Sequence, residues 1–176
     1  INLERLITDR LIIRPITEQD YSDICKYGCD EGTGKYMIYW PKSKQNIRKF
    51  IDEGTTSMNS STVTWYEFAI KLKENNKVIG NISLMIKEQF AEIGWISNSE
   101  YWNNGYMTEA VREIIKYAFH KLCITKIIAT CTNKNRGSYR VMEKCGMSKI
   151  KEEKNYKSMK QGIEVKYNKL TYCIKK

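Results

Sequence analysis

Hydrophobic positions in the first third of the chain predict one strand followed by two helices. Residues 11–14, Leu-Ile-Ile-Arg, are typical of a strand, and the following proline closes it. Residues 17–28 begin with the threonine and aspartate of a helix cap, and residues 43–54 begin with a serine that can cap a second helix. The glycine- and aromatic-containing segment between them, residues 30–41, is expected to be irregular.

The middle of the chain predicts three successive strands. A polar stretch, residues 55–64, precedes apolar and β-branched runs at residues 65–72, 78–84 and 90–97. The first two runs are separated by Glu74-Asn75-Asn76-Lys77, whose turn-forming residues predict a hairpin.

The period of the pattern then changes from two to between three and four. Apolar residues at 110, 111, 114, 115, 118, 119 and 122 predict an amphipathic helix, and the run 124–131 predicts a buried strand. Residues 138–145 predict a second helix that a glycine ends, and residues 163–174 predict the last strand. The basic stretch 149–160 is interpreted as a solvated hairpin, with a role in shaping substrate entry as the alternative. Strands with two late helices predict a mixed sheet that helices cover.

Composition fits one domain, residues 1–176, because 41% hydrophobic residues are enough to enclose a single core. No apolar run reaches the roughly 18 residues of a membrane span. Residues 1–10 mix charges with apolar side chains and lack the apolar region of a secretory signal. We therefore expect a cytoplasmic location without membrane attachment.

The net charge of +10 invites comparison with nucleic-acid-binding proteins. The 30 lysines and arginines are spread along the chain, which is typical of solvated faces, so no direct nucleic-acid partner is expected. The six cysteines contain no C-x-x-C pair and the chain has a single histidine. Reduced, mostly buried thiols are expected, with no metal site.

The chemistry is expected where residues 102–108, Trp-Asn-Asn-Gly-Tyr-Met-Thr, open the amphipathic helix. The first turn of a helix presents N–H groups without intrahelical partners at the positive end of its dipole. Gly105 lets the backbone approach a ligand or adopt a positive φ, so a pyrophosphate would receive several N–H donors there. The alternative is that Gly105 only marks a turn before a core helix.

Four ordered blocks carry a resemblance to a known family. They are residues 8–15 (TDRLIIRP), 91–96 (AEIGWI), 101–110 (YWNNGYMTEA) and 135–147 (NRGSYRVMEKCGM). Together they resemble the GNAT acetyltransferase superfamily, and more narrowly its branch of ribosomal-protein N-terminal acetyltransferases, the RimJ/RimL type. The resemblance runs from about Thr8 to Met147.

The resemblance implies an α/β (α+β) fold with a mixed, mostly antiparallel central sheet of about seven strands, splayed between the fourth and fifth, and helices on both faces. It implies acetyl-CoA as co-substrate, with its pantetheine arm in that gap, much as a peptide adds to a sheet edge. The residues that it assigns to the cofactor are Ile96, Ser97, Trp102, Asn103, Asn104, Gly105, Tyr106, Met107, Thr108 and Asn135.

Two positions depart from the family pattern. Met107 is larger than the residue usual at the end of the phosphate loop, which is expected to alter the pocket. Met142 stands where many superfamily members place a tyrosine that acts as the acid. That tyrosine is therefore absent here, as it usually is in this branch.

Glu92, on the strand that leads to the gap, is the candidate base, because alternation places it on one face with Gly94 and Ile96. The alternative is that Glu92 pairs with a lysine or faces solvent. Ser138 is the candidate acid for the departing sulfur, or else a helix-capping serine. A backbone N–H of residues 95–97 is the candidate oxyanion donor.

The aromatic residues Tyr36, Tyr39, Trp40, Trp65 and Tyr66 either line an amine pocket or pack under the first helices. An α-amine has a pKa of about 8, against about 10.4 for lysine, so a protein N-terminus needs little help from a base.

The sequence therefore predicts an N-acetyltransferase whose acceptor is a primary amine, with a protein N-terminal α-amine as first choice and direct attack in a ternary complex. A polyamine or aminoglycoside acceptor, a CoA-binding regulator without catalysis, and an RNA-binding protein are the alternatives. We expect a monomer or homodimer.

Overall fold

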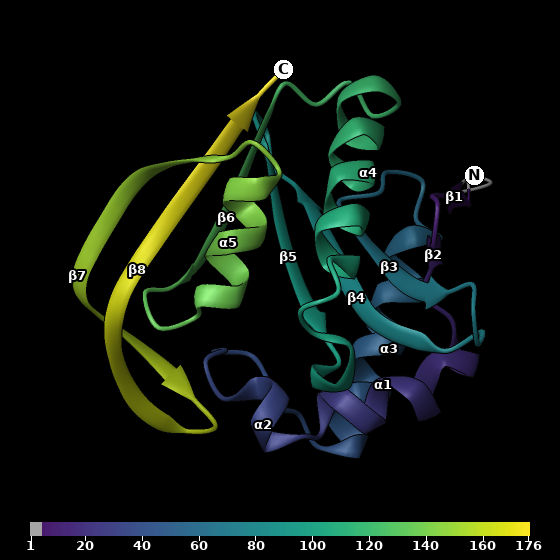
Figure 1. Ribbon diagram of the computed structural model, residues 1–176, viewed down its shortest axis with the longest axis horizontal. Helices are drawn as coiled ribbons and strands as arrows, with labels where there is room; N and C mark the ends of the chain where they lie inside the picture. Colours follow the sequence, from purple (N-terminus) through teal and green to yellow (C-terminus); the bar gives the residue numbers. More distant parts are fainter. Residues whose placement is uncertain (1–4) are drawn as a thin grey trace.

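One sheet runs through the part of the chain, residues 5–176, that the computed structural model describes (Figure 1). Its eight strands lie in the order β1-β2-β3-β4-β5-β6-β8-β7, and every neighbouring pair is antiparallel except β5 and β6. The strands are β1 (Leu6–Ile7), β2 (Leu11–Pro15), β3 (Trp65–Leu72), β4 (Val78–Ile86), β5 (Ala91–Ser97), β6 (Lys126–Thr132), β7 (Ser148–Lys160) and β8 (Ile163–Lys175).

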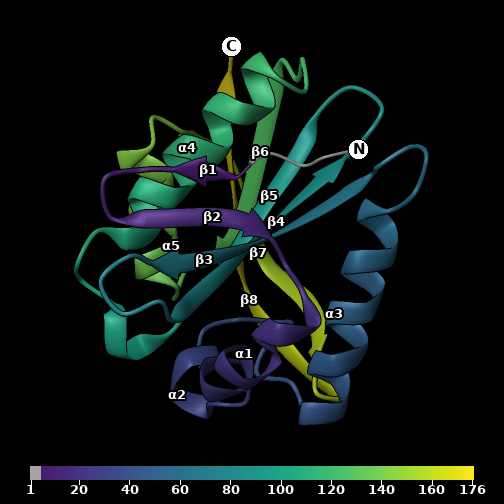
Figure 2. The ribbon, with the colours of Figure 1, turned by 90° about the vertical axis from the view of Figure 1, so that its right-hand side faces the viewer.

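Helices cover both faces of this sheet (Figure 2). α1 and α3 pack against β4 and β3 on one face, whereas α4 and α5 pack against each other and against β2 and β6 on the other. The helices are η1 (Glu18–Asp20), α1 (Tyr21–Gly28), α2 (Glu31–Gly34), α3 (Lys44–Met58), η2 (Ser99–Tyr101), α4 (Tyr106–His120) and α5 (Arg136–Lys144).

Each face has its own hydrophobic core, because strand side chains alternate between the two faces. The apolar stripe of α4, with Ala110, Val111 and Ile114 fully buried, packs in the larger core. The smaller core joins Ile24 of α1 and Ile47 of α3 on the opposite face. The predicted amphipathic helix and the two-sided sheet are thus confirmed.

The sheet opens between β5 and β6. Only two residue pairs join these parallel strands, Ala91 with Ile127 and Glu92 with Ile128. β5 nevertheless pairs with β4 over its whole length, and β6 pairs with β8 over its whole length. Figure 1 shows β5 and β6 close together near the C-terminus and diverging toward α2. This is the predicted splay between the fourth and fifth expected strands.

Several predicted boundaries were wrong. Residues 30–41, expected to be irregular, contain α2, whose N-cap Asp30 accepts a hydrogen bond from the N–H of Thr33 (2.8 Å). α3 continues through Gly54 to Met58. A Cβ at Gly54 would lie 3.4 Å from Glu67 Cβ, so the helix packs against β3 at this glycine and does not end there.

The sheet has one strand more than expected, the short β1. The rest of the expected strands and the solvated β7–β8 hairpin are confirmed, with ends that shift by two residues at most. The first four residues of the N-terminal segment lie outside the described residues. None of the helices in residues 5–176 combines the length and hydropathy that crossing a membrane requires.

Candidate active site

A cavity of about 380 Å³ lies where β5 and β6 separate. One wall is formed by the β4 and β5 strands, and the opposite wall by β6 and the first turns of α5. The loop of residues 36–40 and the β7–β8 hairpin close its remaining sides. The cavity therefore reaches from the sheet interior to the face that α1 and α3 cover.

The two candidate catalytic residues lie on different walls of this cavity. Glu92 projects from β5, is half-buried, and forms no ion pair with any residue in 5–176. The alternative that it pairs with a lysine is therefore wrong. Ser138 lies on α5, and its backbone N–H donates to Oδ1 of Asn135 (3.2 Å).

Asn135, not Ser138, is the N-cap of α5. The interpretation of Ser138 as a helix cap is therefore wrong, because the helix begins two residues earlier, at Arg136. Asn135 also lines the cavity, so its predicted place beside the cofactor and its capping role are compatible.

The loop before α4 has the geometry of an anion site. Gly105 adopts φ +78°, the left-handed conformation that favours glycine. The N–H of Glu109 donates to Gly105 O (3.0 Å), which is the first bond of the helix. The N–H groups of Tyr106, Met107 and Thr108 therefore point out of the helix start, where a phosphate would accept them.

Side chains within the loop hold its backbone in place. Asn103 also has a positive φ (+63°). The amide nitrogen of Asn104 donates to the carbonyl oxygens of Tyr101 (3.1 Å) and Trp102 (3.0 Å). Trp102 Nε1 donates to Ser97 O (2.8 Å), which joins the loop to the end of β5. The backbone of residues 102–105 is therefore already ordered before a ligand binds, which lowers the entropy cost of binding.

The backbone carbonyl groups of Ile96 and Ser97, the two residues predicted to contact the pantetheine arm, have different surroundings. Ser97 O already accepts from Trp102, as described above. Ile96 O lies 2.6 Å from the position of a Cβ at Gly80, so this carbonyl faces β4 and not the gap. Because backbone groups alternate along a strand, those of Trp95 are directed toward the gap beside β6.

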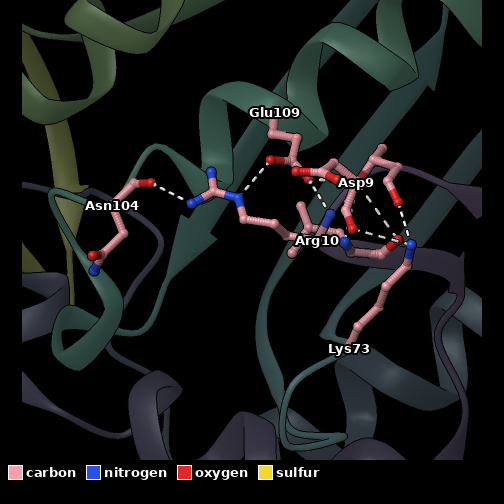
Figure 3. Close-up of polar contacts among 7 residues, drawn as sticks. Asp9, Arg10, Lys73, Asn104 and Glu109 are labelled. Carbon is pink, nitrogen blue, oxygen red and sulfur yellow. Dashed lines mark hydrogen bonds and ion pairs between the residues drawn. The ribbon is translucent and has the colours of Figure 1, made fainter.

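Arg10, in the turn just before β2, ties this loop to the body of the sheet (Figure 3). Its Nε atom lies 2.8 Å from Glu109 Oε1, and its Nη1 atom donates to Asn104 O (2.9 Å). The guanidinium also lies 4.3 Å from the centre of the Tyr106 ring. Thr8 Oγ1 and the N–H of Arg10 donate to Glu109 Oε2 (2.6 and 3.0 Å). Burial opposes ionisation of Glu109, but these hydrogen bonds outweigh it and lower its pKa.

Met107 does not line the cavity between β5 and β6. Its side chain is 9% exposed and packs in the larger core, with Cε 3.1 Å from the Cβ position at Gly80. Only the backbone N–H of Met107 faces the loop. Met142 is 1% exposed and lines the cavity as an apolar wall.

Comparison with known proteins identifies the family. A profile of the acetyltransferase (GNAT) domain matches residues 10–148. The chain belongs to the GNAT acetyltransferase family. The uncharacterized N-acetyltransferase YnaD of Bacillus subtilis is 32% identical over 144 residues, which is 81% of each chain.

Solved structures of GNAT proteins share the fold. A GNAT acetyltransferase from Bacillus anthracis is 28% identical, with a TM-score of 0.85 over 98% of each chain. The ribosomal alpha-N-protein acetyltransferase RimL, in complex with coenzyme A, is 15% identical, with a TM-score of 0.82 over 97% of this chain and 96% of that one. This GNAT protein is thus an N-acetyltransferase with the expected splayed sheet.

Sequence reasoning missed a buried carboxylate beside the site of this GNAT protein. Glu67 of β3 is fully buried and accepts hydrogen bonds from Trp65 Nε1 (2.9 Å), Asn81 Nδ2 (2.8 Å) and Ser83 Oγ. Asn81 and Ser83 themselves line the cavity. Strand alternation alone gives no sign of this, because it predicts only that Glu67 shares a face with Trp65 and Ala69. The polar Asn81 and Ser83 on the neighbouring strand are the signal that was available.

The aromatic candidates divide between the two expected roles. Tyr36, Tyr39 and Trp40 line the cavity, and Tyr39 is 78% exposed. Trp65 instead lies against the Phe50 ring (5.6 Å between ring centres), and Tyr66 is stacked on Phe68 in the larger core (6.1 Å). The predicted aromatic lining therefore holds for the loop of residues 36–40 only.

All six cysteines are unpaired. Cys173 is buried and Cys123 is exposed, while the other four are half-buried, so the expectation of mostly buried thiols was only partly right. Burial raises the pKa of Cys131, which lines the cavity, to about 12. The Cys131 thiol is therefore protonated at neutral pH and is a poor nucleophile.

Proposed function

We propose that this GNAT protein transfers the acetyl group of acetyl-CoA to the α-amine of a protein N-terminus, by direct attack in a ternary complex. The observation that carries the choice of acceptor is the charge of the cavity wall. Among the described side chains that line it, Glu92 is the one carboxylate and Lys169 the one cation. A polyamine or aminoglycoside carries several positive charges and calls for an acidic cleft, whereas a single α-amine does not.

Acetyl-CoA fits the residues that are present. The outward N–H groups of residues 106–108 supply donors for a pyrophosphate, with the positive end of the α4 dipole behind them. The open edge of β5 beyond Glu92 offers backbone groups to an extended pantetheine arm. Asn103, Asn104 and Asn135 supply further polar contacts around this path.

The acceptor would reach the thioester from the side of residues 36–40. Glu92 would hold the ammonium group and accept its proton, directly or through a water molecule. The N–H of a residue in 95–97 would stabilise the oxyanion, and the Ser138 hydroxyl would protonate the departing sulfur. Bound acetyl-CoA supplies the activated acyl group for this step. The RimL neighbour, whose name describes an alpha-N-protein acetyltransferase, supports the choice of a protein N-terminus.

A transfer assay tests this proposal. The purified protein would be incubated with radiolabelled acetyl-CoA and hexapeptides beginning with Ser or Ala, with the same peptides blocked at the N-terminus as matched controls. We expect label in the free peptides and none in the blocked ones. Turnover of spermidine or an aminoglycoside with none of any peptide would overturn the choice of acceptor. Tight CoA binding with no turnover of any amine would overturn catalysis altogether.

A further inference from the structure

The buried Glu67 carboxylate is held by hydrogen bonds, and it forms no ion pair with any residue in 5–176. Three neutral groups, Trp65 Nε1, Asn81 Nδ2 and Ser83 Oγ, donate to its two oxygens. Tyr27 OH donates to Asn81 Oδ1 (2.7 Å), which fixes the amide so that its nitrogen must point at Glu67. The arrangement therefore holds the carboxylate in one orientation.

The environment of Glu67 places its titration in the neutral range. Burial raises its pKa to about 7, and the hydrogen bonds and the charge of Lys42 only partly offset this effect. The groups that face it from other elements are Tyr27 of α1, whose pKa is raised by burial, and Lys42 before α3, whose pKa is lowered by burial. Glu53 of α3 acts on Lys42 in the opposite direction.

Ser83 connects this carboxylate to the cavity. It is half-buried, lines the cavity, and lies directly across from Gly94 of β5 in the antiparallel register. A Cβ at Gly94 would have nothing within 4 Å, so the space beside Ser83 is open. The Ser83 hydroxyl thus touches the acceptor side of the cavity with one oxygen lone pair, while its hydrogen is directed at Glu67.

We propose that Ser83 is a catalytic residue that takes a proton from the acceptor's ammonium group and passes its own proton to Glu67. An N–H bond of the ammonium group breaks, and its proton forms a new O–H bond on Ser83. At the same time the original Ser83 O–H bond breaks, and that proton forms an O–H bond on Glu67. The ammonium becomes a neutral amine and the carboxylate becomes a neutral acid, so charge and atoms balance. Glu67 acts through Ser83 and is a positioning residue as well as the proton store.

This inference rests on the proposed function and adds a second proton acceptor to it. Glu92 and the Ser83–Glu67 pair approach the acceptor nitrogen from neighbouring strands, β5 and β4. Glu92, the carboxylate that lines the cavity, attracts the ammonium group and accepts the second proton, which the nitrogen loses after the new C–N bond has formed. Glu67 is screened from water, so a proton placed on it is not lost to solvent during the attack.

The pH dependence of kcat/KM with a Ser-initiated peptide tests the relay. We expect the wild-type rate to rise through an apparent pKa near 7, and Ser83→Ala to lower kcat about 100-fold and remove this inflection, the size typical of general base catalysis. Ser83→Thr, which keeps a hydroxyl, is the matched control and should restore most of the rate. Glu92→Gln should raise KM for the peptide and keep the inflection.

A second measurement keeps the test independent of folding and of turnover. Carbon-13 NMR of the side-chain carboxyls, assigned by comparison with Glu67→Gln, should show a Glu67 titration near pH 7 in the CoA-bound wild-type protein. Folded Ser83→Ala with kcat within threefold of wild type, or a Glu67 titration below pH 5, would overturn the proposal. Absence of wild-type turnover with any amine would instead overturn the proposed function, while the NMR titration would still test the proton store.

Discussion

The Arg10 guanidinium bridges Glu109 and the carbonyl oxygen of Asn104, with Nε 2.8 Å from Glu109 Oε1 and Nη1 2.9 Å from Asn104 O. This contact joins the turn before β2 to the first turn of α4 and to the loop before that helix. The N–H groups proposed to bind the pyrophosphate therefore depend on a side chain about a hundred residues earlier in the sequence. Phosphate binding and the stability of the N-terminal strand should change together.

Glu109→Gln should weaken both the binding of coenzyme A and the stability of the fold. The substitution removes the carboxylate charge that Thr8 and Arg10 hydrogen-bond and breaks the ion pair with Arg10, so we expect the free energy of unfolding to fall by about 1–2 kcal/mol. The dissociation constant for CoA should rise about tenfold, because each factor of ten corresponds to about 1.4 kcal/mol. Urea unfolding and calorimetric titration measure the two effects.

The difference in the free energy of unfolding between wild type and Glu109→Gln should also depend on pH. The pKa of Glu109 is lowered in the folded state, so its stabilisation is present above its unfolded pKa and is lost as the pH falls through the folded value. Wild type and Glu109→Gln should therefore converge in stability in acid. Glu113→Gln, one turn along the same helix, is the control and should change neither quantity. An equal loss of stability and of coenzyme A binding in Glu109→Gln and Glu113→Gln would contradict the role of the Arg10 bridge.

Gly105→Ala tests the conformation of the phosphate loop. A Cβ there would meet Arg10 Nη2 at 3.5 Å, an ordinary contact, so the cost comes from φ +78°. We expect a loss of about 1–2 kcal/mol in the free energy of unfolding, with weaker CoA binding. Gly137→Ala is the matched control, since that glycine has open space and no positive φ. Thermal unfolding of the two variants with and without CoA makes the comparison.

Gly94→Leu should block the acceptor without disturbing the cofactor. Gly94 has no atom within 4 Å of its Cβ position, and it faces Ser83 across the acceptor side of the cavity. We expect at least about a tenfold rise in KM for the amine, with the dissociation constant of CoA unchanged. If CoA binding is lost as well, the two ligands do not occupy the separate sides proposed here.

Glu67 should make stability depend on pH in the opposite sense to Glu109. Its folded pKa, about 7, lies above the unfolded value, so its contribution is fully present below the unfolded pKa and is lost as the pH rises toward 7. The difference between the two pKa values corresponds to about 3 kcal/mol. Urea unfolding between pH 5 and 8 should show this decline in wild type and a flatter profile in Glu67→Gln. Parallel profiles would contradict the raised pKa.

Lys160→Met tests the closure of the acceptor side. Lys160 Nζ donates to Gly34 O (2.7 Å) and Lys35 O (3.2 Å), which joins the end of β7 to α2 and the residue after it. Removing the amine keeps the apolar stem but frees the hairpin, so we expect a rise of about threefold to tenfold in KM for a peptide. Lys157→Met, at an exposed position of the same strand, should leave KM unchanged.

Hydrophobic periodicity predicted most of the fold, because most elements bury one continuous apolar stripe. α4 is the best case, since its apolar residues recur at helical spacing and all pack in one core. α3 shows the limit of this reasoning. Gly54 indicates a helix end in the sequence, but in the structure it is a point of close contact with β3, which depends on tertiary packing.

The candidate site was predicted where local sequence determines the geometry. Gly105 is required by its positive φ, and the loop before α4 can therefore be recognised from a few residues. Glu67 could not be recognised in this way, because its role depends on Asn81 and Ser83 of the next strand and on Tyr27 of α1. The polar Asn81 and Ser83 in an apolar strand indicate a buried polar partner, but the sequence alone does not say which residue it is. The capping role of Asn135 was missed because Ser138 offered an equally good local cap.

The two faces of β5 have different neighbours, so the residues proposed to bind the amine and those proposed to bind coenzyme A can change independently. The side chains of Ala91 and Ile93 are anchored in the core beneath α4, whereas Glu92 and Gly94 look out toward residues 36–40 and the β7–β8 hairpin. Under the proposed function, substitutions in residues 36–40 and in the β7–β8 hairpin would change the amine that is accepted and leave coenzyme A binding intact. Related enzymes with this arrangement would then be able to evolve new acceptor specificity while they keep the same site for acetyl-CoA.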